Sequence, residues 1–370
     1  MKKLVNLLMV AVFVLSASSL SYARGPFITP GARATGYGTA FVSIADDLTA
    51  IFWNPAGLAY QKSTQMMLSS YYVSVNATSN DTSGYPTKYE TSAIVPFLGF
   101  STPLNKTTTI AFGMYASGGG GGKVANIDPY QLEGEQSFMV YNVSVAKNIN
   151  DKLSVGVGVE GIEMRDKLVC KIPYAMMGLP YPGVSNIDYS RGAFGFQGNI
   201  GIMYKPVEKL STGFILRSGT YIGLPKEPNS SFVDGYTYPM TMELGASYNV
   251  LNPLTVAVAV AYNKYSWTSA EYNDTVQFRI GTEYKATKQL SLNLGFFTDP
   301  NIYKNSSSYT ITNVDMYNMN YLCIGAGYDI TTAMKVGLTY THSFTQDVVN
   351  NNITYQYPVD MGRFDVSFKF

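Results

Sequence analysis

Short stretches in which bulky apolar side chains alternate with small or polar ones recur along this chain, and they constrain its fold more than any other feature. Between residues 254 and 262, Leu, Val and Tyr occupy the even positions and Thr or Ala the odd ones. The same alternation covers residues 276–281 and 334–341. Because successive side chains of a β-strand point to opposite faces of a sheet, each stretch predicts a strand with one apolar face.

About fourteen such segments follow residue 62, and their connections alternate between short and long. The segments lie near residues 64–77, 91–104, 108–117, 137–148, 153–166, 191–204, 210–222, 238–249, 254–266, 275–285, 290–298, 319–329, 334–345 and 362–370. The long connections cover about 78–90, 118–136, 167–190, 223–237, 267–274, 299–318 and 346–361. Short turns alternating with long outside loops are typical of bacterial outer-membrane barrels. The sequence therefore predicts an all-β fold, a transmembrane antiparallel β-barrel of about fourteen strands over residues 63–370.

The composition agrees with a membrane barrel. Charged residues make up 14% of the chain, below the usual share of about 25%, and aromatic residues reach 14%, with 30 Tyr. No run of 18 apolar residues follows residue 23, so a transmembrane helix is not expected. The net charge of +1 provides no basic surface for nucleic acid.

Residues 1–23, MKKLVNLLMVAVFVLSASSLSYA, have the pattern of a secretory signal peptide. Two lysines precede an apolar stretch, and Ser21-Tyr22-Ala23 resembles a cleavage site. The apolar stretch is too short to span a membrane as a helix. We therefore expect export, and together with the barrel pattern it predicts a bacterial outer-membrane location.

The segment between the signal peptide and the first strand, residues 24–62, is long and does not alternate. About fourteen strands, ~4.8 Å apart and tilted about 40°, enclose a backbone cylinder roughly 28 Å across, which the wall side chains cannot fill. Such a barrel is either an open pore or plugged. Asp46 or Asp47 is placed to cap a short helix, which Asn54-Pro55 then ends. We expect residues 24–62 to form a compact hatch inside the barrel.

The stretch GARATGYGTAFVSIADDLTAIFWNPAGLA, residues 31–59, resembles the hatch of the FadL/TodX family. These proteins are outer-membrane transporters of long-chain fatty acids and other hydrophobic compounds. Glycines, Ala-Asp-Asp and Asn-Pro-Ala follow one another in the same order in both. The likeness continues over most of the chain, for example in ILRSGTYIGL at 215–224 and GAGYDITTAMKVGLTYTHSF at 325–344. The loops diverge most.

The resemblance implies a passive, gated channel whose lumen is closed by the hatch. A ligand, either a long-chain fatty acid or another hydrophobic small molecule, would land among the outside loops and move to a site beneath them. Hatch rearrangement would then release it sideways into the outer-membrane lipid, where the third strand bends inward. The gating residues implied are Asp46, Asp47, Asn54, Pro55, Ala56 and Gly57. No cofactor is implied, and a closed barrel is expected to be a monomer.

Five consecutive glycines near the end of the third strand are candidates for that lateral opening. They are Gly118, Gly119, Gly120, Gly121 and Gly122. Either they let the backbone bend at the opening or they form an ordinary flexible loop. The run lacks the first glycine and the Ser/Thr of a phosphate-binding loop, so a phosphate site is not expected.

A second group of glycines matches a nucleotide-binding spacing. Gly156, Gly158 and Gly161 have the GxGxxG pattern, but they lie on a predicted strand with no helix to present a phosphate site. We interpret them as small lumen-facing residues.

Two groups of residues are candidates for ligand binding. The loop at 170–184 is unusually apolar, and its side chains either form a landing groove or pack against neighbouring loops; the groove candidates are Met176, Met177, Leu179 and Tyr181. Arg217 falls on the inward parity of its strand and is placed to meet a ligand carboxylate. Arg165 is a second candidate, although its parity points outward unless a bulge intervenes. Alternatively, these arginines pair with lumen acids such as Glu160, Glu243 or Glu283.

An enzymatic function is not expected. The single histidine, His342, has no serine in a position to form a hydrolase site, and no metal-binding cluster is present in the sequence. Cys170 and Cys323 are either unpaired or linked in an oxidising compartment. Two alternatives to a transporter remain at this stage, a barrel that serves as a structural or secretion partner and a general porin.

Overall fold

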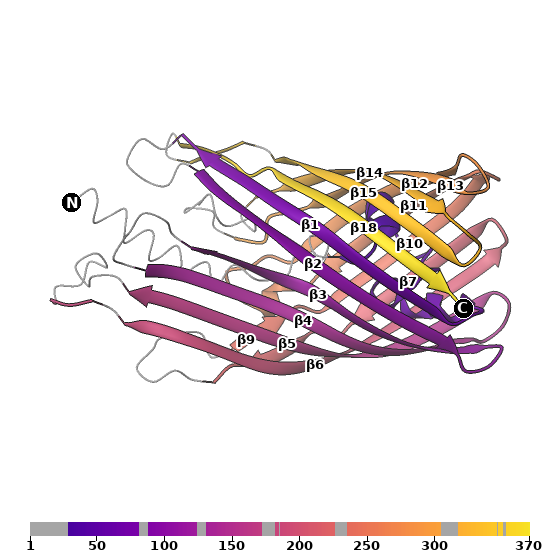
Figure 1. The fold of residues 1–370 in the computed structure, drawn as a ribbon, viewed down its shortest axis with the longest axis horizontal. Helices are drawn as coiled ribbons and strands as arrows, with labels where there is room; N and C mark the ends of the chain where they lie inside the picture. The colour runs from indigo at the N-terminus through magenta and orange to yellow at the C-terminus, as the bar shows by residue number, and fades with distance from the viewer. Residues whose placement is uncertain are drawn as a thin grey trace.

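The computed structural model describes residues 29–80, 88–123, 131–171, 182–184, 186–225, 235–304, 317–345, 347–350 and 353–370. The expected signal peptide therefore lies outside the described residues. Within them, one sheet contains sixteen strands, and two of these, β16 (Val348–Asn350) and β17 (Ile353–Gln356), form a hairpin at the rim. The other fourteen form the barrel wall (Figure 1).

The wall strands are long and every neighbouring pair is antiparallel. Their bounds are β1 (Gln65–Ser79), β2 (Lys88–Pro103), β3 (Thr108–Lys123), β4 (Gln131–Asn148), β5 (Leu153–Lys171), β6 (Ile187–Val207), β7 (Leu210–Arg217), β10 (Thr241–Leu251), β11 (Leu254–Asn263), β12 (Thr275–Lys285), β13 (Leu290–Asp299), β14 (Met319–Asp329), β15 (Met334–Thr345) and β18 (Val359–Lys369). The first strand pairs with both β2 and the last strand, β18, from Gln65↔Lys369 to Val75↔Val359. The sheet is thus closed, and the predicted barrel is confirmed.

Two features of the wall differ from the sequence prediction. The predicted strand at 210–222 is broken: β7 ends at Arg217, Gly219 has a φ of 69°, and β8 (Thr220–Gly223) pairs with β9 (Gly235–Tyr238) in a separate hairpin. Strands β4, β5 and β6 also extend well into the predicted long loops. Their outward side chains become polar there, as at Glu133 and Lys167, so the apolar alternation stops before the hydrogen-bonded ladder does.

The two faces of the wall follow the predicted alternation. On β11, Val258 and Val260 are 48% and 43% exposed, whereas Ala259 between them is 4% exposed. On β12, Phe278 points outward and Gln277 and Arg279 are buried. The apolar residues therefore face the lipid, and the small or polar residues face the lumen.

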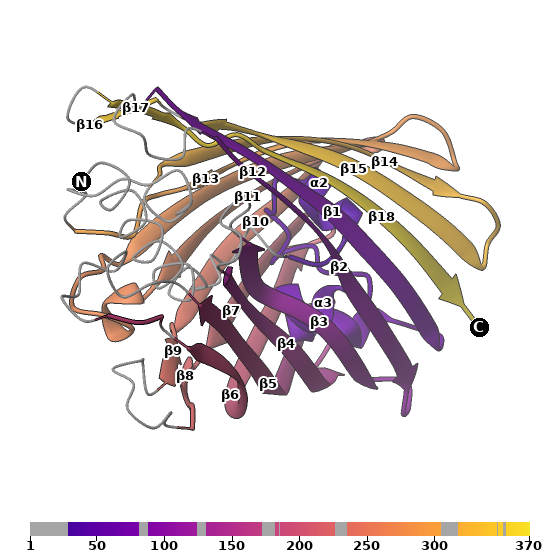
Figure 2. The ribbon, with the colours of Figure 1, turned by 60° about the vertical axis from the view of Figure 1, so that its left-hand side comes forward.

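Short helical elements of the N-terminal segment lie within the ring of strands (Figure 2). They are α2 (Ala32–Gly36), α3 (Ala50–Trp53) and the 3-10 helix η1 (Pro55–Tyr60). A further 3-10 turn, η3 (Tyr265–Trp267), follows β11. No helix among the described residues has the length and apolarity needed to cross a membrane.

Candidate functional site

The N-terminal segment, residues 29–62, is almost completely buried against the inner wall. Inward-facing glycines of the wall lie where the segment approaches most closely; they are Gly99, Gly113, Gly156, Gly201, Gly213, Gly281 and Gly295. A Cβ added at Gly156 would overlap the backbone of Pro55, and one added at Gly281 would overlap the backbone of Tyr37. The glycines thus form a belt that makes room for backbone inside the barrel.

Asn54 is the best-anchored residue of the segment. Its side chain is fully buried, and Nδ2 donates to the carbonyl of Val42 at 2.8 Å and to that of Ile202 on β6 at 3.1 Å. Oδ1 accepts from the backbone N–H of Ala56 at 3.1 Å, which caps η1. Helix α3 ends at Trp53, where the sequence predicted the break. The Asn-Pro-Ala stretch therefore both turns the segment and ties it to the wall.

The two aspartates before α3 have a different role from the predicted one. The N-cap of α3 is Thr49, and no side chain caps this helix. The Oδ1 atom of Asp47 accepts instead from the backbone N–H of Thr49 at 2.9 Å, and Asp46 forms an ion pair with Arg33. The capping prediction was wrong, because the helix begins further along the chain than the aspartates allow.

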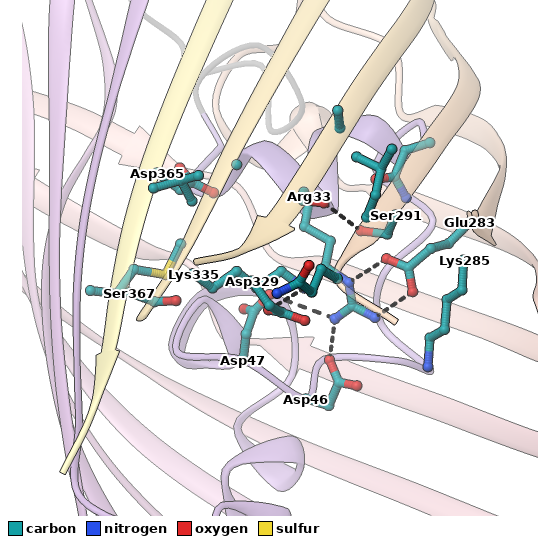
Figure 3. A pocket seen from close by; sticks show the side chains of 18 of the residues that line it. Arg33, Asp46, Asp47, Glu283, Lys285, Ser291, Asp329, Lys335, Asp365 and Ser367 are labelled. Atoms are coloured by element: carbon teal, nitrogen blue, oxygen red, sulfur yellow. Dashed lines mark hydrogen bonds and ion pairs between the residues drawn. The ribbon is translucent and has the colours of Figure 1, made fainter. Parts of the chain in front are cut away.

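Arg33 links the segment to the wall near the short-turn end of the barrel (Figure 3). Its Nε and Nη2 atoms donate to the two carboxylate oxygens of Glu283 at 2.7 and 3.2 Å. Burial alone would lower the pKa of the Arg33 guanidinium, but Asp46 and Glu283 outweigh it and hold that pKa above its ordinary value. A cavity of about 300 Å³ opens beside this network, lined by charged residues that include Lys285, Lys335 and Asp329.

A second, smaller cavity lies on the opposite side of the segment, towards the long loops. Its volume is about 60 Å³. One wall is Phe52 of α3; the others are Tyr115, Ser117, Val140, Glu160, Gln197, Arg217, Tyr238, Pro239, Thr241, Asn263 and Tyr265. Rings and aliphatic groups dominate the lining, and Glu160 and Arg217 are its two oppositely charged residues. We call this the upper cavity.

Arg217 and Phe52 hold the floor of the upper cavity together. The Arg217 guanidinium donates to the backbone carbonyl of Phe52, and its central carbon lies 4.6 Å from the centroid of the Phe52 ring. Tyr115 of β3 contacts the other side of that ring, edge to face, at 5.5 Å between centroids. Arg217 does face the lumen, as its parity predicts, and its Nε atom is 3.7 Å from Glu160 Oε1, as the ion-pair alternative proposed.

The Glu160 carboxylate is the most heavily hydrogen-bonded acid of the described lumen wall. It is 1% exposed and accepts from Tyr115 Oη at 3.2 Å and from Asn142 Nδ2 at 3.0 Å. Gln197 and Asn199 of β6 also donate to it, Asn199 at 2.7 Å. Oε1 accepts three of these hydrogen bonds and Oε2 accepts the fourth, from Gln197, so both carboxylate oxygens have donors.

The wall has a gap beside the upper cavity, between β2 and β3. Pairing of these strands ends at Phe97↔Tyr115, although β2 and β3 both continue towards the long loops. Pro96, the next residue of β2, has no N–H to donate to a ladder. On β3 a bulge follows between Ala116 and Gly118, and beyond it β3 pairs with β4 alone.

The glycine run predicted to form the lateral opening lies in the part of β3 that no longer pairs with β2. Its members are Gly118, Gly119, Gly120, Gly121 and Gly122, and each has a partner on β4. The flexible-loop alternative is therefore wrong, because the run continues the strand beyond the end of the apolar alternation. The residue before the run contacts a strand outside this part of the wall: Ser117 Oγ lies 2.5 Å from Tyr238 Oη on β9.

The backbone irregularity is confined to the start of the run. The bulge ends at Gly118, and Gly119 has a φ of 148°, which L residues rarely adopt. Gly120 and Gly121 pair in register with Gln136 and Glu135 of β4. The prediction that all five glycines bend the strand thus needs correction at Gly120 and Gly121, where the ladder with β4 is continuous.

Other predicted residues lie away from the upper cavity. Arg165 is on the outer face, with its side chain 72% exposed and bonded to Glu163, so the suggestion that it meets a ligand in the lumen is not supported. Gly156 and Gly158 face the lumen, but Gly161 faces outward and was misassigned. The groove candidates Met176, Met177, Leu179 and Tyr181 lie outside the described residues. Cys323 is a free, buried thiol.

Sequence reasoning missed the rings of the upper cavity. Phe52, Tyr115 and Tyr238 come from distant parts of the chain, and their convergence depends on strand register and on the position of α3. The one available signal was the inward parity of Tyr115 on its predicted strand.

Comparisons with known proteins agree with this architecture. Residues 14–367 match the family described as outer membrane protein transport protein (OMPP1/FadL/TodX). Outer membrane protein P1 of Haemophilus influenzae is 21% identical to this chain. The alignment covers 92% of this chain and 90% of that protein. A Pseudomonas aeruginosa FadL homologue has 16% identity and a TM-score of 0.72, with 93% of this chain and 99% of that one covered.

The Pseudomonas putida toluene transporter TodX gives a TM-score of 0.75 at 15% identity, with 93% of this chain and 98% of that one covered. At such identities the likeness to these structures shows the fold, whereas the family match spans nearly the whole sequence. The protein is therefore a member of the OMPP1/FadL/TodX family of outer-membrane transport proteins, a family of channels and not of enzymes.

Proposed function

We propose that this protein is a passive, gated channel for long-chain fatty acids or other hydrophobic compounds, and that residues 29–62 are its hatch. One arrangement carries the proposal: this segment is buried against the inner wall, and the upper cavity lies between its Phe52 and the gap in the wall beyond Tyr115. A ligand held there has a route past β3 into lipid. The solved relatives named as toluene and monoaromatic hydrocarbon channels support the hydrophobic class of ligand.

The physics of apolar ligands favours a sideways route. A sixteen-carbon fatty acid has about 15 methylenes, each worth ~0.8 kcal/mol to keep out of water, or roughly 12 kcal/mol in all. In a water-filled pore the methylenes would stay in contact with water, so this free energy would not be gained. A cavity walled by Phe52, Tyr115 and Tyr265, followed by an opening into the bilayer, provides most of it.

The size of the upper cavity requires the hatch to move. The volume of about 60 Å³ is less than half of the about 150 Å³ of a cavity that binds benzene. The ring of Phe52 is the part of the hatch that fills the difference. We therefore propose that ligand entry displaces Phe52, and that this displacement loosens α3 from the wall.

A reversible lock on α3 tests this mechanism. The Cβ of Ile51 is 3.6 Å from the position of a Cβ built at Gly113 on β3, within the usual disulfide range of about 3.5–4.5 Å. The atoms of Ile51 that crowd this position are removed by Ile51→Cys. We suggest combining Ile51→Cys and Gly113→Cys with Cys170→Ser and Cys323→Ser.

Uptake of a labelled fatty acid and of toluene would then be measured in cells before and after reduction. Oxidised protein is expected to lose uptake of whichever ligand it carries, and a reductant is expected to restore it. The two single-cysteine variants control for the substitutions. Equal uptake by the oxidised and reduced forms would count against a moving hatch.

A further inference from the structure

The upper cavity contains one positive and one negative side chain, and both are already engaged. Arg217 has its guanidinium on the ring and carbonyl of Phe52 and its Nε atom 3.7 Å from Glu160. No Lys and no second Arg lines this cavity among the described residues. The cavity is therefore electrically balanced before any ligand enters it.

The Glu160 carboxylate is held in place by its neighbours. Four side chains from three other strands donate to it, and Asn142, one of the four, also donates to the backbone carbonyl of Ile51 in the hatch at 3.4 Å. Each of these donors is oriented towards an acceptor. A ligand carboxylate entering the cavity would be a second anion beside Glu160, and the two would share a single guanidinium.

We propose that Glu160 is a specificity-determining residue that makes the upper cavity select neutral apolar molecules, ring-bearing ones above all, over carboxylates. This rests on the proposed function and decides between the two ligand classes that it leaves open. The positive half of the pair, Arg217, acts on the hatch and not on a ligand headgroup. The aromatic side chains of Phe52, Tyr115 and Tyr265 line the cavity and supply apolar contacts suited to a flat, uncharged ligand.

Binding of two probes of equal shape and different charge tests the proposal. Naphthalene and 2-naphthoate would be titrated into the purified full-length protein in detergent, with the quenching of tyrosine and tryptophan emission as the signal. Wild type is expected to bind naphthalene at least about tenfold more tightly than naphthoate, a difference of about 1.4 kcal/mol. Glu160→Gln is expected to tighten naphthoate binding about tenfold or more and to change naphthalene binding less than about threefold.

Glu163→Gln is the matched control, because Glu163 lies on the outward face of the same strand and pairs with Arg165. It should leave both affinities unchanged. Arg217→Gln provides a second variant should Glu160→Gln not fold; with the negative charge retained and the positive one removed, naphthoate binding should fall below detection while naphthalene still binds.

The outcomes separate this inference from the proposed function. Wild type that prefers naphthoate, or a Glu160→Gln ratio equal to that of wild type, would overturn the role of Glu160 while leaving a hydrophobic channel intact. Wild type that binds neither probe would overturn the upper cavity as a ligand site, on which both the role of Glu160 and the proposed route depend.

Discussion

Gly156 on β5 has no room for a side chain, because the backbone of Pro55 occupies the position of its Cβ. Gly161 on the same strand faces outward, where an added Cβ would meet only ordinary contacts from 3.5 Å. On this one strand, Gly156 is required for the close approach of the N-terminal segment, whereas Gly161 is not. At the scale of single residues, the hatch is accommodated by omission of side chains from the wall.

Gly156→Ala should destabilise the folded protein by about 1–3 kcal/mol, the usual cost of overpacking a tight site. The midpoint of thermal unfolding is expected to be lower. It can be measured by the shift in gel migration that accompanies loss of the barrel. Gly161→Ala serves as the comparison and should leave the midpoint within experimental error. Equal midpoints for the two variants would contradict the close approach of Pro55.

Asn54→Ala removes the three hydrogen bonds of the Asn54 side chain and leaves the carbonyls of Val42 and Ile202 without this donor. Losing partners of buried polar groups costs about 1–3 kcal/mol. We expect faster hydrogen exchange in residues 50–60 and lower ligand uptake, with the barrel still folded. Asn76→Ala, at an exposed asparagine near the rim, is the control. Unchanged exchange in residues 50–60 would show that Asn54 does not anchor the hatch.

At the scale of elements, β3 loses one of its neighbours partway along, on the side that faces β2. The bulge at Ser117 and the missing N–H of Pro96 on β2 both occur within two residues of the last pair, Phe97↔Tyr115. Residues of both adjacent strands thus mark the start of the gap, and on β3 the bulged residue Ser117 contacts Tyr238 of β9.

Deletion of Ser117 would remove the extra residue of the bulge and let β3 run straight beside β2. Uptake of the hydrophobic ligand is expected to fall about tenfold or more, because the lateral exit would close. Ser117→Ala keeps the bulge and loses only the contact with Tyr238, so it should retain most of the uptake. If the deletion variant is folded and transports normally, the exit lies elsewhere.

The elements show what the sequence could and could not predict. Period-2 alternation located all fourteen wall strands, because the lipid imposes one apolar face on each of them. The predicted strands were shorter than the observed β5 and β6. Beyond the membrane the hydrogen-bonded ladder continues, but the outward side chains no longer need to be apolar. The upper cavity could not be predicted, because Phe52, Arg217 and Glu160 line it together only through the register of strands β5 to β7 and the fold of the N-terminal segment.

At the scale of the whole molecule, the proposed hatch is what would distinguish this barrel from a general porin. Its attachments come from strands on all sides: Thr339 of β15 donates to Ala32, Ser211 of β7 to Ser43 and Asn148 of β4 to Ala59, each at 2.7 Å from the carbonyl oxygen. Attachments distributed in this way tie the segment to well-separated parts of the wall and not to one edge.

The proposed closure predicts the electrical behaviour of the intact protein. In a planar bilayer, wild type should be nearly silent if residues 29–62 plug the lumen as proposed. A variant lacking residues 29–62 should show steady currents at least about tenfold larger, as expected for an aqueous lumen of this strand number. Gly156→Ala, which displaces only part of the hatch, should give brief, intermittent openings. Large steady currents from wild type would instead mean that the segment does not close the barrel, and the general-porin alternative would then be favoured over a gated channel.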